Sequence, residues 1–441
     1  MRLRGLGAAW AALALIVLGT AWAAELPERP LTLDDCWVLA RERSPSLVVA
    51  QQRLYVSEAG VQRVVSQYFP TATLLANYGR NGGSSFLRAS AGTVSIAVSG
   101  TRHESEVLLS QTLWALGRRE SLLSARHSLR ASYADVQTAE QSIALAVAQL
   151  YYQALAAEAL VKVSEATLAA SRDHGKLVSA RVSVGEGAPV DIAPAEADVA
   201  NAEFSLLQSG NGSALAKARL KNGVGLPATY DLHLAAPGIP SGCETVPALA
   251  EAVRAALQKR PEMVSARDSV DAAQQEFHAA QIQRNGTLAL TSQYDRGIAG
   301  PQKGASWSAV VSLSGFLFDA GAREADVVTA RANLAILQAQ EQQTANQVGL
   351  EVETARLDLD TARKSVETAE KAVTSAQSQL SAAEGKYQRG VGIFVEVLDA
   401  QRTLAQARTN QVQARYDCLT ALVALQRAMG QLTLPPGQTQ P

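Results

Sequence analysis

The chain has 441 residues, a formal net charge of −1, and a composition that is 47% hydrophobic and 18% charged. Charges of both signs are mixed along it, which argues against a nucleic-acid-binding surface. The length alone suggests two or three domains, but no Pro/Ser-rich linker divides the middle, so we interpret the chain as one continuous body.

The first residues have the pattern of a secretory signal. Arg2 and Arg4 precede an apolar stretch over residues 8–18, and Ala23 ends a small-residue site of the kind that signal peptidase cleaves. We therefore predict a signal peptide over residues 1–23. No later segment has eighteen uninterrupted apolar residues, so no membrane-spanning helix is expected in the mature chain.

An internal repeat follows. Residues 33–78 read as helix, Ser44-Pro45, helix and alternating strand, and residues 249–294 repeat that order with Arg260-Pro261 at the matching place. Each half continues through a second strand into a long helix, a glycine turn and a further helix. The predicted organisation is a first repeat over 24–240, a second over 241–433 and a disordered tail over 434–441.

Helix starts carry local signals. Thr32 and Asp35 have the spacing of a capping box, and Ser44 before Pro45 reads as a cap followed by a first helical residue. Asp319 is placed to cap the second long helix.

Four segments of about ten residues alternate between apolar and small polar residues, near residues 71–78, 104–113, 287–294 and 306–317. A barrel with lipid outside and water within has this pattern, and so does any half-buried sheet. Four strands leave two open edges, and about eight strands are needed to close a barrel. Several copies must then share one barrel, and three would supply twelve strands.

The helical stretches are too long for a compact domain. No proline interrupts residues 116–181, and at about 1.5 Å per residue such a helix is roughly 100 Å long. Seven-residue ladders predict coiled-coil seams. Their members are Leu122, Leu129, Val136, Ile143, Leu150 and Ala157 in the first half and Val348, Ala355, Ala362, Ala369, Ala376 and Ala383 in the second. A second row in each half consists of Val147, Ala154, Val161 and Leu168, and of Val352, Leu359, Val366, Val373 and Leu380.

The three cysteines, Cys36, Cys243 and Cys418, are an odd number for an exported chain. Two of them could pair and leave one free, or all three could be small buried hydrophobic residues, which is the interpretation we prefer. The five histidines are scattered without metal-ligand spacing, and no catalytic or phosphate-binding motif is present. We expect no enzyme activity, no cofactor and no metal.

At the level of motifs the chain resembles the TolC family of trimeric outer-membrane efflux ducts. The resemblance covers nearly the whole mature chain and is most specific at the two turns. Val184-Gly185 is followed by Asp191 six residues after the glycine, and Arg389-Gly390 is followed by Glu396 at the same spacing. Residues 395–400, Val-Glu-Val-Leu-Asp-Ala, are an especially close match.

The resemblance implies a mainly helical protein with a membrane β part. Such a protein would form a homotrimer, with four strands per protomer in a shared twelve-stranded barrel in the outer-membrane lipid. Its long antiparallel coiled-coil helices would form a periplasmic tube. Substrates would leave passively, and a periplasmic adaptor linked to an inner-membrane pump would dock at the tip. The implied docking residues are Val184, Gly185, Gly187, Arg389, Gly390 and Gly392.

Carried over by position, Asp191 and Tyr387 match members of the gate network, and Glu396 and Asp399 match the acidic rings that narrow the pore. The arginine that the family has two residues after the second tip glycine is replaced by Gly392, so the usual latch to Asp191 is not available.

The residues also support a separate argument. Glu396 and Asp399 are three apart and share one helix face, so three copies would place six carboxylates at a narrow mouth, which favours cations. Without the resemblance, the alternative interpretation is that Glu396 and Asp399 only complement the helix dipole, because they lie near the start of a helix. For the whole chain, the alternative function is a periplasmic coiled-coil adaptor, although an adaptor would carry a single helical hairpin rather than two.

Overall fold

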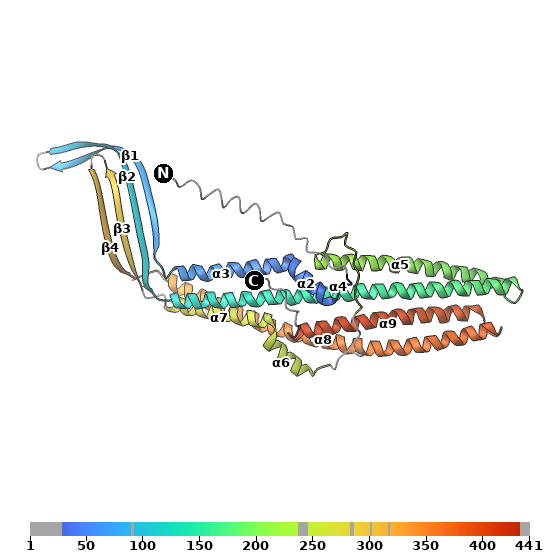
Figure 1. Cartoon of the computed structure of the whole chain (residues 1–441). Coiled ribbons are helices and arrows are strands. Elements are labelled where there is room, and N and C mark those ends of the chain that lie inside the picture. The colour runs from blue at the N-terminus through green and yellow to red at the C-terminus, as the bar shows by residue number, and fades with distance from the viewer. Residues whose placement is uncertain are drawn as a thin grey trace.

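The computed structural model describes residues 29–89, 92–236, 246–282, 286–299, 302–315 and 318–432. The predicted signal peptide, the tail and Cys243 lie outside the described residues. The molecule is elongated, with a sheet at one end and helices that run away from it (Figure 1). This arrangement agrees with the predicted class, a mainly helical chain with a small β part.

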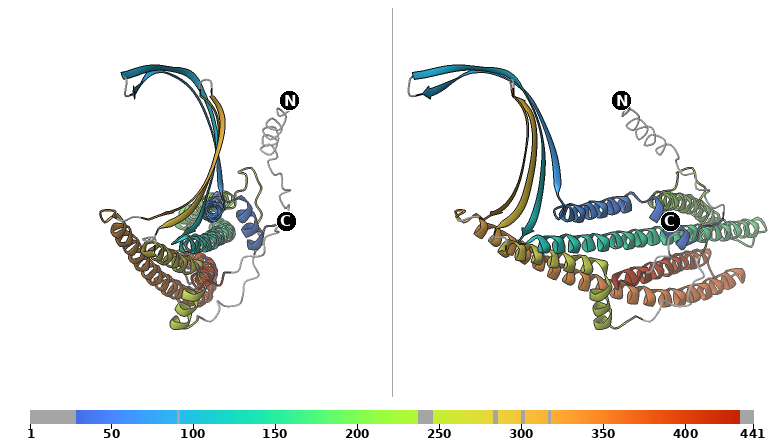
Figure 2. Two further views of the ribbon diagram at one scale, coloured as in Figure 1. Left: turned by 90° about the vertical axis from the view of Figure 1, so that its left-hand side faces the viewer. Right: turned by 60° about the vertical axis from the view of Figure 1, so that its left-hand side comes forward.

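The sheet has four strands in the order β1-β2-β3-β4, and each neighbouring pair is antiparallel. The strands are β1 (Thr71–Ala89), β2 (Gly92–Ala115), β3 (Thr287–Ala299) and β4 (Gln302–Ser314). The sheet curves strongly along its length, as Figure 2 shows. β1 and β4 each have one edge without a neighbour in the sheet order.

The first two strands are longer than the ten residues expected. They have 19 and 24 residues, because the β1–β2 ladder continues to Ala89↔Gly92 after the β2–β3 ladder has ended at Arg102↔Ala299. Backbone hydrogen bonds extend a hairpin whatever the side-chain pattern, so the amphipathic segment marked only part of each strand. Leu317, expected in the fourth strand, lies outside the described residues.

One face of the sheet is apolar and exposed, as the alternation predicts. Among its members, Trp307 is 78% exposed and Leu313 is 75% exposed. The others that stand out are Leu74, Tyr78, Val107, Leu109, Tyr294 and Val311. Among the described residues, no other element covers these side chains, and an exposed apolar face of this kind is typical of a surface that contacts a membrane or another protein.

Two helix pairs repeat with equal lengths. Helices α2 (Leu33–Arg43) and α6 (Leu249–Lys259) have 11 residues each, and α3 (Pro45–Ser66) and α7 (Pro261–Ile282) have 22 each. The long helices α4 (Arg118–Ser183) and α8 (Ala322–Gln388) have 66 and 67 residues. Each is followed, after a turn, by a returning helix. These are α5 (Ile192–Val224), preceded by the short 3₁₀ helix η1 (Pro189–Asp191), and α9 (Phe394–Ala428).

The predicted caps are partly right. The Thr32 capping box is present, with the Asp35 N–H donating to Thr32 Oγ1 at 3.2 Å and the Thr32 N–H to Asp35 Oδ2 at 3.0 Å. Ser44 is the N-cap of α3 but makes no side-chain cap bond. Asp319 is not the N-cap of α8; Gly321 is, with φ 89°, and Asp319 Oδ1 accepts the Gly321 N–H instead.

The predicted seam is confirmed on α8, where all six members of the ladder from Val348 to Ala383 are buried. The prediction for α4 is confirmed in part: the row from Leu122 to Ala157 is only half-buried, whereas Val147, Ala154 and Leu168 of the row offset by four residues are buried. The buried residues of α4 include Ala131, Ala144, Tyr151 and Leu168. α4 packs against α2, α3, α5, α7 and α9 along its length, so its buried side changes and follows no single heptad row.

Within the described residues, α4 is also long and apolar enough, by length and composition, to cross a membrane. Its most apolar window has a mean hydropathy of 1.3, and 39% of that window is buried in the protomer. The helix is about 100 Å long at 1.5 Å per residue, about three times the thickness of a bilayer core, and it packs on five other described helices. We therefore assign it to the helical wall.

Of the two interpretations of the cysteines, a disulfide that leaves one thiol free agrees with the structure better than three unpaired buried residues. Cys36 is a free, buried thiol whose pKa is raised to about 12 by burial and by the charge of Asp35. Cys418 is disulfide-bonded, so the preferred interpretation of three unpaired hydrophobic residues is wrong for it.

Candidate functional site at the helical tip

The two turns that join the long helices to the returning helices have the same backbone hydrogen bonds. In the first, the N–H groups of Glu186 and Gly187 both donate to the Arg181 carbonyl, at 2.9 and 3.0 Å. In the second, Val391 and Gly392 both donate to the Lys386 carbonyl, at 3.1 and 3.2 Å. Residues 205 apart therefore take equivalent places at the tip, which lies at the far end of the helices from the sheet (Figure 1).

The glycines of these turns are required by the backbone. Gly185 and Gly390 have φ of 80° and 74°, a left-handed conformation that side chains disfavour. A Cβ at Gly392 would lie 2.9 Å from the Lys386 Cβ and 3.2 Å from the Tyr387 nitrogen, and Gly187 is equally close to Val182. In this chain a side chain at position 392 would have to displace the end of α8.

Tyr387, in the last turn of α8, lies at the centre of the tip. It is buried, and its ring centroid is 5.5 Å from that of Phe394, the first residue of α9. From the other hairpin, Arg181 Nη1 donates to the Tyr387 carbonyl at 2.8 Å. The Arg181 guanidinium carbon also lies 5.1 Å from the Tyr387 ring centroid, which is a cation–π distance.

Asp191 ends η1 and approaches the same tyrosine. Burial, the negative charge of Asp191 and a hydrogen bond to its carboxylate together raise the pKa of Tyr387, while the Arg181 guanidinium opposes them. The structure thus brings Asp191 and Tyr387 together, from different hairpins, as the sequence comparison with the family implied. It also adds Arg181 to the group.

Glu396 and Asp399 lie in the first two turns of α9, and both are exposed. Their neighbours Val397, Leu398 and Ala400 are buried, so the two acids lie on the side of α9 that faces away from the protomer. Arg402, three residues further on, places Nη1 3.8 Å from Asp399 Oδ1. The acidic pair therefore has a cation within one turn of it.

The remaining predicted docking residues are on the outside of the tip. Val184 and Arg389 are exposed, one in each turn. We call Val184, Val190, Val391 and Ile393 the tip apolar residues, and their side chains are between 64% and 76% exposed. Four such residues at the end of a helical structure form an apolar surface that nothing in the protomer covers.

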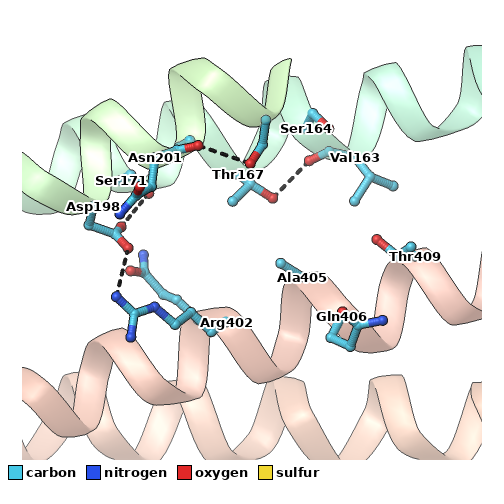
Figure 3. A pocket seen from close by; sticks show the side chains of 13 residues that line it. Val163, Ser164, Thr167, Ser171, Asp198, Asn201, Arg402, Ala405, Gln406 and Thr409 are labelled. Carbon is cyan, nitrogen blue, oxygen red and sulfur yellow. Dashed lines mark hydrogen bonds and ion pairs between the residues drawn. The ribbon is translucent and has the colours of Figure 1, made fainter. Parts of the chain in front are cut away.

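Above the tip, a polar hollow of about 320 Å³ separates the α4–α5 hairpin from α9 (Figure 3). Asp198 of α5 is buried in it and accepts a hydrogen bond from Ser171 Oγ of α4 at 2.6 Å. Arg402 of α9 reaches across to Asp198, with Nη2 3.8 Å from Oδ1. Gln401, 8% exposed, also lines the hollow, and neither its amide nitrogen nor its amide oxygen has a hydrogen-bond partner among the described residues.

A second polar group lies nearer the sheet. His127 Nδ1 of α4 is 2.9 Å from Asp268 Oδ1 of α7 and 3.6 Å from Asp271 Oδ2. The sequence did not reveal this group, because its members are about 140 residues apart. Arg130 lies 3.0 Å from Asp268 and contacts the His127 ring, so its positive charge occupies the place where a cation would bind. We interpret the group as an ion-pair cluster that joins α4 to α7.

Three tip residues, Arg181, Asp198 and Arg402, were missed from the sequence. Arg181 had a signal, since it is the repeat counterpart of Lys386 and has the same charge. Asp198 and Arg402 had none, because their importance depends on how the two hairpins pack.

Comparison with known proteins agrees with this geometry. The family model described as "Outer membrane efflux protein" matches residues 37–226 and 252–431, which is most of the chain. Among curated proteins, Protein CyaE of Bordetella pertussis (strain Tohama I) is 29% identical over 413 residues, covering 91% of this chain and 84% of its own length.

Solved structures share the fold. The outer-membrane channel OprN superposes with a TM-score of 0.79 at 21% identity, covering 91% of each chain. The outer membrane protein VceC of Vibrio cholerae gives a TM-score of 0.76 at 21% identity, covering 90% of this chain and 96% of its own. At these identities the match concerns the fold.

Proposed function

Because the chain belongs to the outer membrane efflux protein family, we propose that three copies of it assemble into a passive exit duct whose tip residues form a gate. The chain is an outer-membrane efflux channel protein with a helical extension into the periplasm. The family is one of transport channels rather than of enzymes. We assign no catalytic role to the chain.

The observation that carries the proposed trimer is the sheet. β1 and β4 both end the strand order, and unpaired backbone groups are not tolerated in lipid. The exposed apolar face, with Trp307 and Leu313 on it, suits the hydrocarbon region. Pairing β4 of one copy with β1 of the next closes the edges, and three copies give the twelve strands of a barrel wide enough for a water-filled passage.

The gate is proposed from the tip contacts. Asp191 and Arg181 belong to the α4–α5 hairpin, and both act on Tyr387 of the α8–α9 hairpin. These contacts hold the two hairpins together where they end. Three copies would bring Glu396 and Asp399 around the axis, because both face away from the protomer core.

For the partner, the tip apolar residues support docking of a periplasmic adaptor that is linked to an inner-membrane pump. Their exposed side chains surround the turns at Gly185 and Gly390, where a helical hairpin of another protein could bury them. The cargo is either small molecules or secreted polypeptide.

The assembly is tested by expression and fractionation. Outer-membrane fractions should contain trimers that dissociate only on heating, and recovery of a monomer in the osmotic-shock fluid would contradict the proposal. The gate is tested by replacing Glu396 and Asp399 with alanine in trimers reconstituted in planar bilayers. Block of the current by Mg²⁺ should weaken, because the acidic mouth attracts cations; block equal to that of the wild type would remove both residues from the constriction.

A further inference from the structure

Arg402 lies between two carboxylates that belong to different parts of the protomer. Its Nη1 is 3.8 Å from Asp399 Oδ1, one turn earlier on the same helix, and its Nη2 is 3.8 Å from Asp198 Oδ1 on the other hairpin. Figure 3 shows the Arg402 side chain, which reaches across the polar hollow to Asp198. Both are ion-pair distances, so the Arg402 guanidinium pairs with the carboxylates of both Asp399 and Asp198.

The two acids differ in how firmly they are held. Asp198 has a side chain only 12% exposed, and Ser171 of α4 donates to it at 2.6 Å, so it is fixed to the α4–α5 hairpin. Asp399 is 66% exposed and Arg402 is 62% exposed. Arg402 can therefore change its position, while Asp198 stays with its hairpin.

The side chains that line the hollow around this contact do not fix the two hairpins in one relative position. Both amide atoms of Gln401, next to Arg402, have no protein partner there. The hollow has a volume of about 320 Å³, and most of the side chains that line it are polar. Little apolar packing therefore joins α9 to α4 and α5 at that level, and movement between them there would cost less than in a closely packed core. The distance from Arg402 to Asp198 depends on such movement, whereas its distance to Asp399 does not, because both are on α9.

We propose that Arg402 couples separation of the two hairpins to the charge at the mouth of the duct. With the hairpins together, its charge is shared between Asp198 and Asp399. When the hairpins part, Arg402 loses Asp198, pairs with Asp399 alone and neutralises part of the acidic constriction. This makes Arg402 a selectivity-determining residue, and the inference rests on the proposed placement of Asp399 at that constriction.

The test is block by Mg²⁺ of the current through single trimers in planar bilayers, measured for two variants. If the substitutions only loosened the structure, both would shift the block in the same direction. Arg402→Gln removes the cation, so the half-blocking Mg²⁺ concentration should fall, by roughly three- to tenfold for one charge per copy. Asp198→Asn releases Arg402 to Asp399, so the half-blocking concentration should rise. Both variants should still give heat-dissociable trimers.

Two controls make the test specific. Arg408→Gln changes an arginine of the same helix that binds Gln377 within its own hairpin, and its block should equal that of the wild type. In an Asp399→Asn background, Asp198→Asn should have no further effect, since the second partner of Arg402 is gone. Shifts of both variants in the same direction, or no shift in either, would overturn the inference. Absence of channels in the wild type would instead refute the proposed function, and the inference with it.

Discussion

Arg181 and Tyr387 join the two helical hairpins at the tip: the Arg181 guanidinium donates to the Tyr387 carbonyl at 2.8 Å and lies 5.1 Å from the centre of its ring. The two residues are 206 positions apart and belong to different repeats. A backbone carbonyl as acceptor means that the contact depends on the position of α8 itself, and not on one rotamer of Tyr387.

Arg181→Gln should therefore weaken the closed tip. Loss of a charged hydrogen bond and of the cation–π contact removes about 2–3 kcal/mol from the contact between hairpins. We expect a larger resting conductance of reconstituted trimers. Arg172→Gln is the matched control, because Arg172 pairs with Glu203 within the α4–α5 hairpin at 2.7 Å. If both variants conduct like the wild type, Arg181 is not part of the gate.

Gly392→Ala should disturb the second turn although it adds one methyl group. Its Cβ would lie 2.9 Å from the Lys386 Cβ, so the end of α8 must shift, at a cost of about 1–3 kcal/mol. Faster tryptic cleavage at the tip is the expected result. Gly385→Ala is the control, because its Cβ would meet only the Arg389 side chain at 3.9 Å and should stabilise the helix by about 0.5–1 kcal/mol. Equal cleavage of the two variants would contradict the steric argument.

Arg260→Met should destabilise the region where α6, α7, α8 and α9 meet. Arg260 is 2% exposed and binds Glu262 at 3.0 Å and Glu351 at 2.7 Å, and Arg427 binds the same two acids. Removing one arginine leaves the partly buried carboxylates with a single cation, a loss of about 3–5 kcal/mol. Thermal unfolding, followed by circular dichroism, measures this loss of stability. Arg267→Met, at a half-exposed arginine of α7, should cost less than about 1 kcal/mol.

The same group predicts a pH dependence. Burial opposes ionisation of Glu262 and Glu351, but hydrogen bonds from Arg260 outweigh it and lower the pKa of both. Their contribution to stability is therefore complete above the ordinary glutamate pKa of about 4.3 and is lost as the pH falls through the lowered values. The unfolding temperature should decline below about pH 4.3, and the decline should be shallower in Arg260→Met. Parallel curves for the two proteins would show that the acid sensitivity arises elsewhere.

Adjacent residues of β4 lie on opposite faces of the sheet, the exposed apolar face that we propose contacts lipid and the polar face. Val311→Arg places a charge on the exposed apolar face, where it should cost about 2–4 kcal/mol near the middle of the bilayer. Ser312→Arg places the same charge one residue later, on the polar face, and should be tolerated. The yield of heat-dissociable trimers in outer-membrane fractions should drop for the first variant only; equal yields would mean that Val311 does not face lipid.

The local pattern alone was enough to predict several features. Alternation in the strands identified the apolar face, the α8 ladder identified a buried seam, and the spacing of Thr32 and Asp35 identified a capping box. Each depends on residues within one or two turns or along one strand, where the geometry of the backbone leaves few choices. The resemblance to the family singled out the turn glycines, Asp191 and Tyr387, and it gave no distance between them.

Only the tertiary structure decided how the hairpins meet. The buried face of α4 contacts five different helices along its length, so no single heptad row describes it. The positions of Arg181, Asp198 and Arg402 become meaningful when helices from different repeats lie side by side, because an ion pair depends on distances of about 4 Å that sequence separation does not encode. The sequence thus determined the elements, and packing between the repeats determined which charges face each other at the tip.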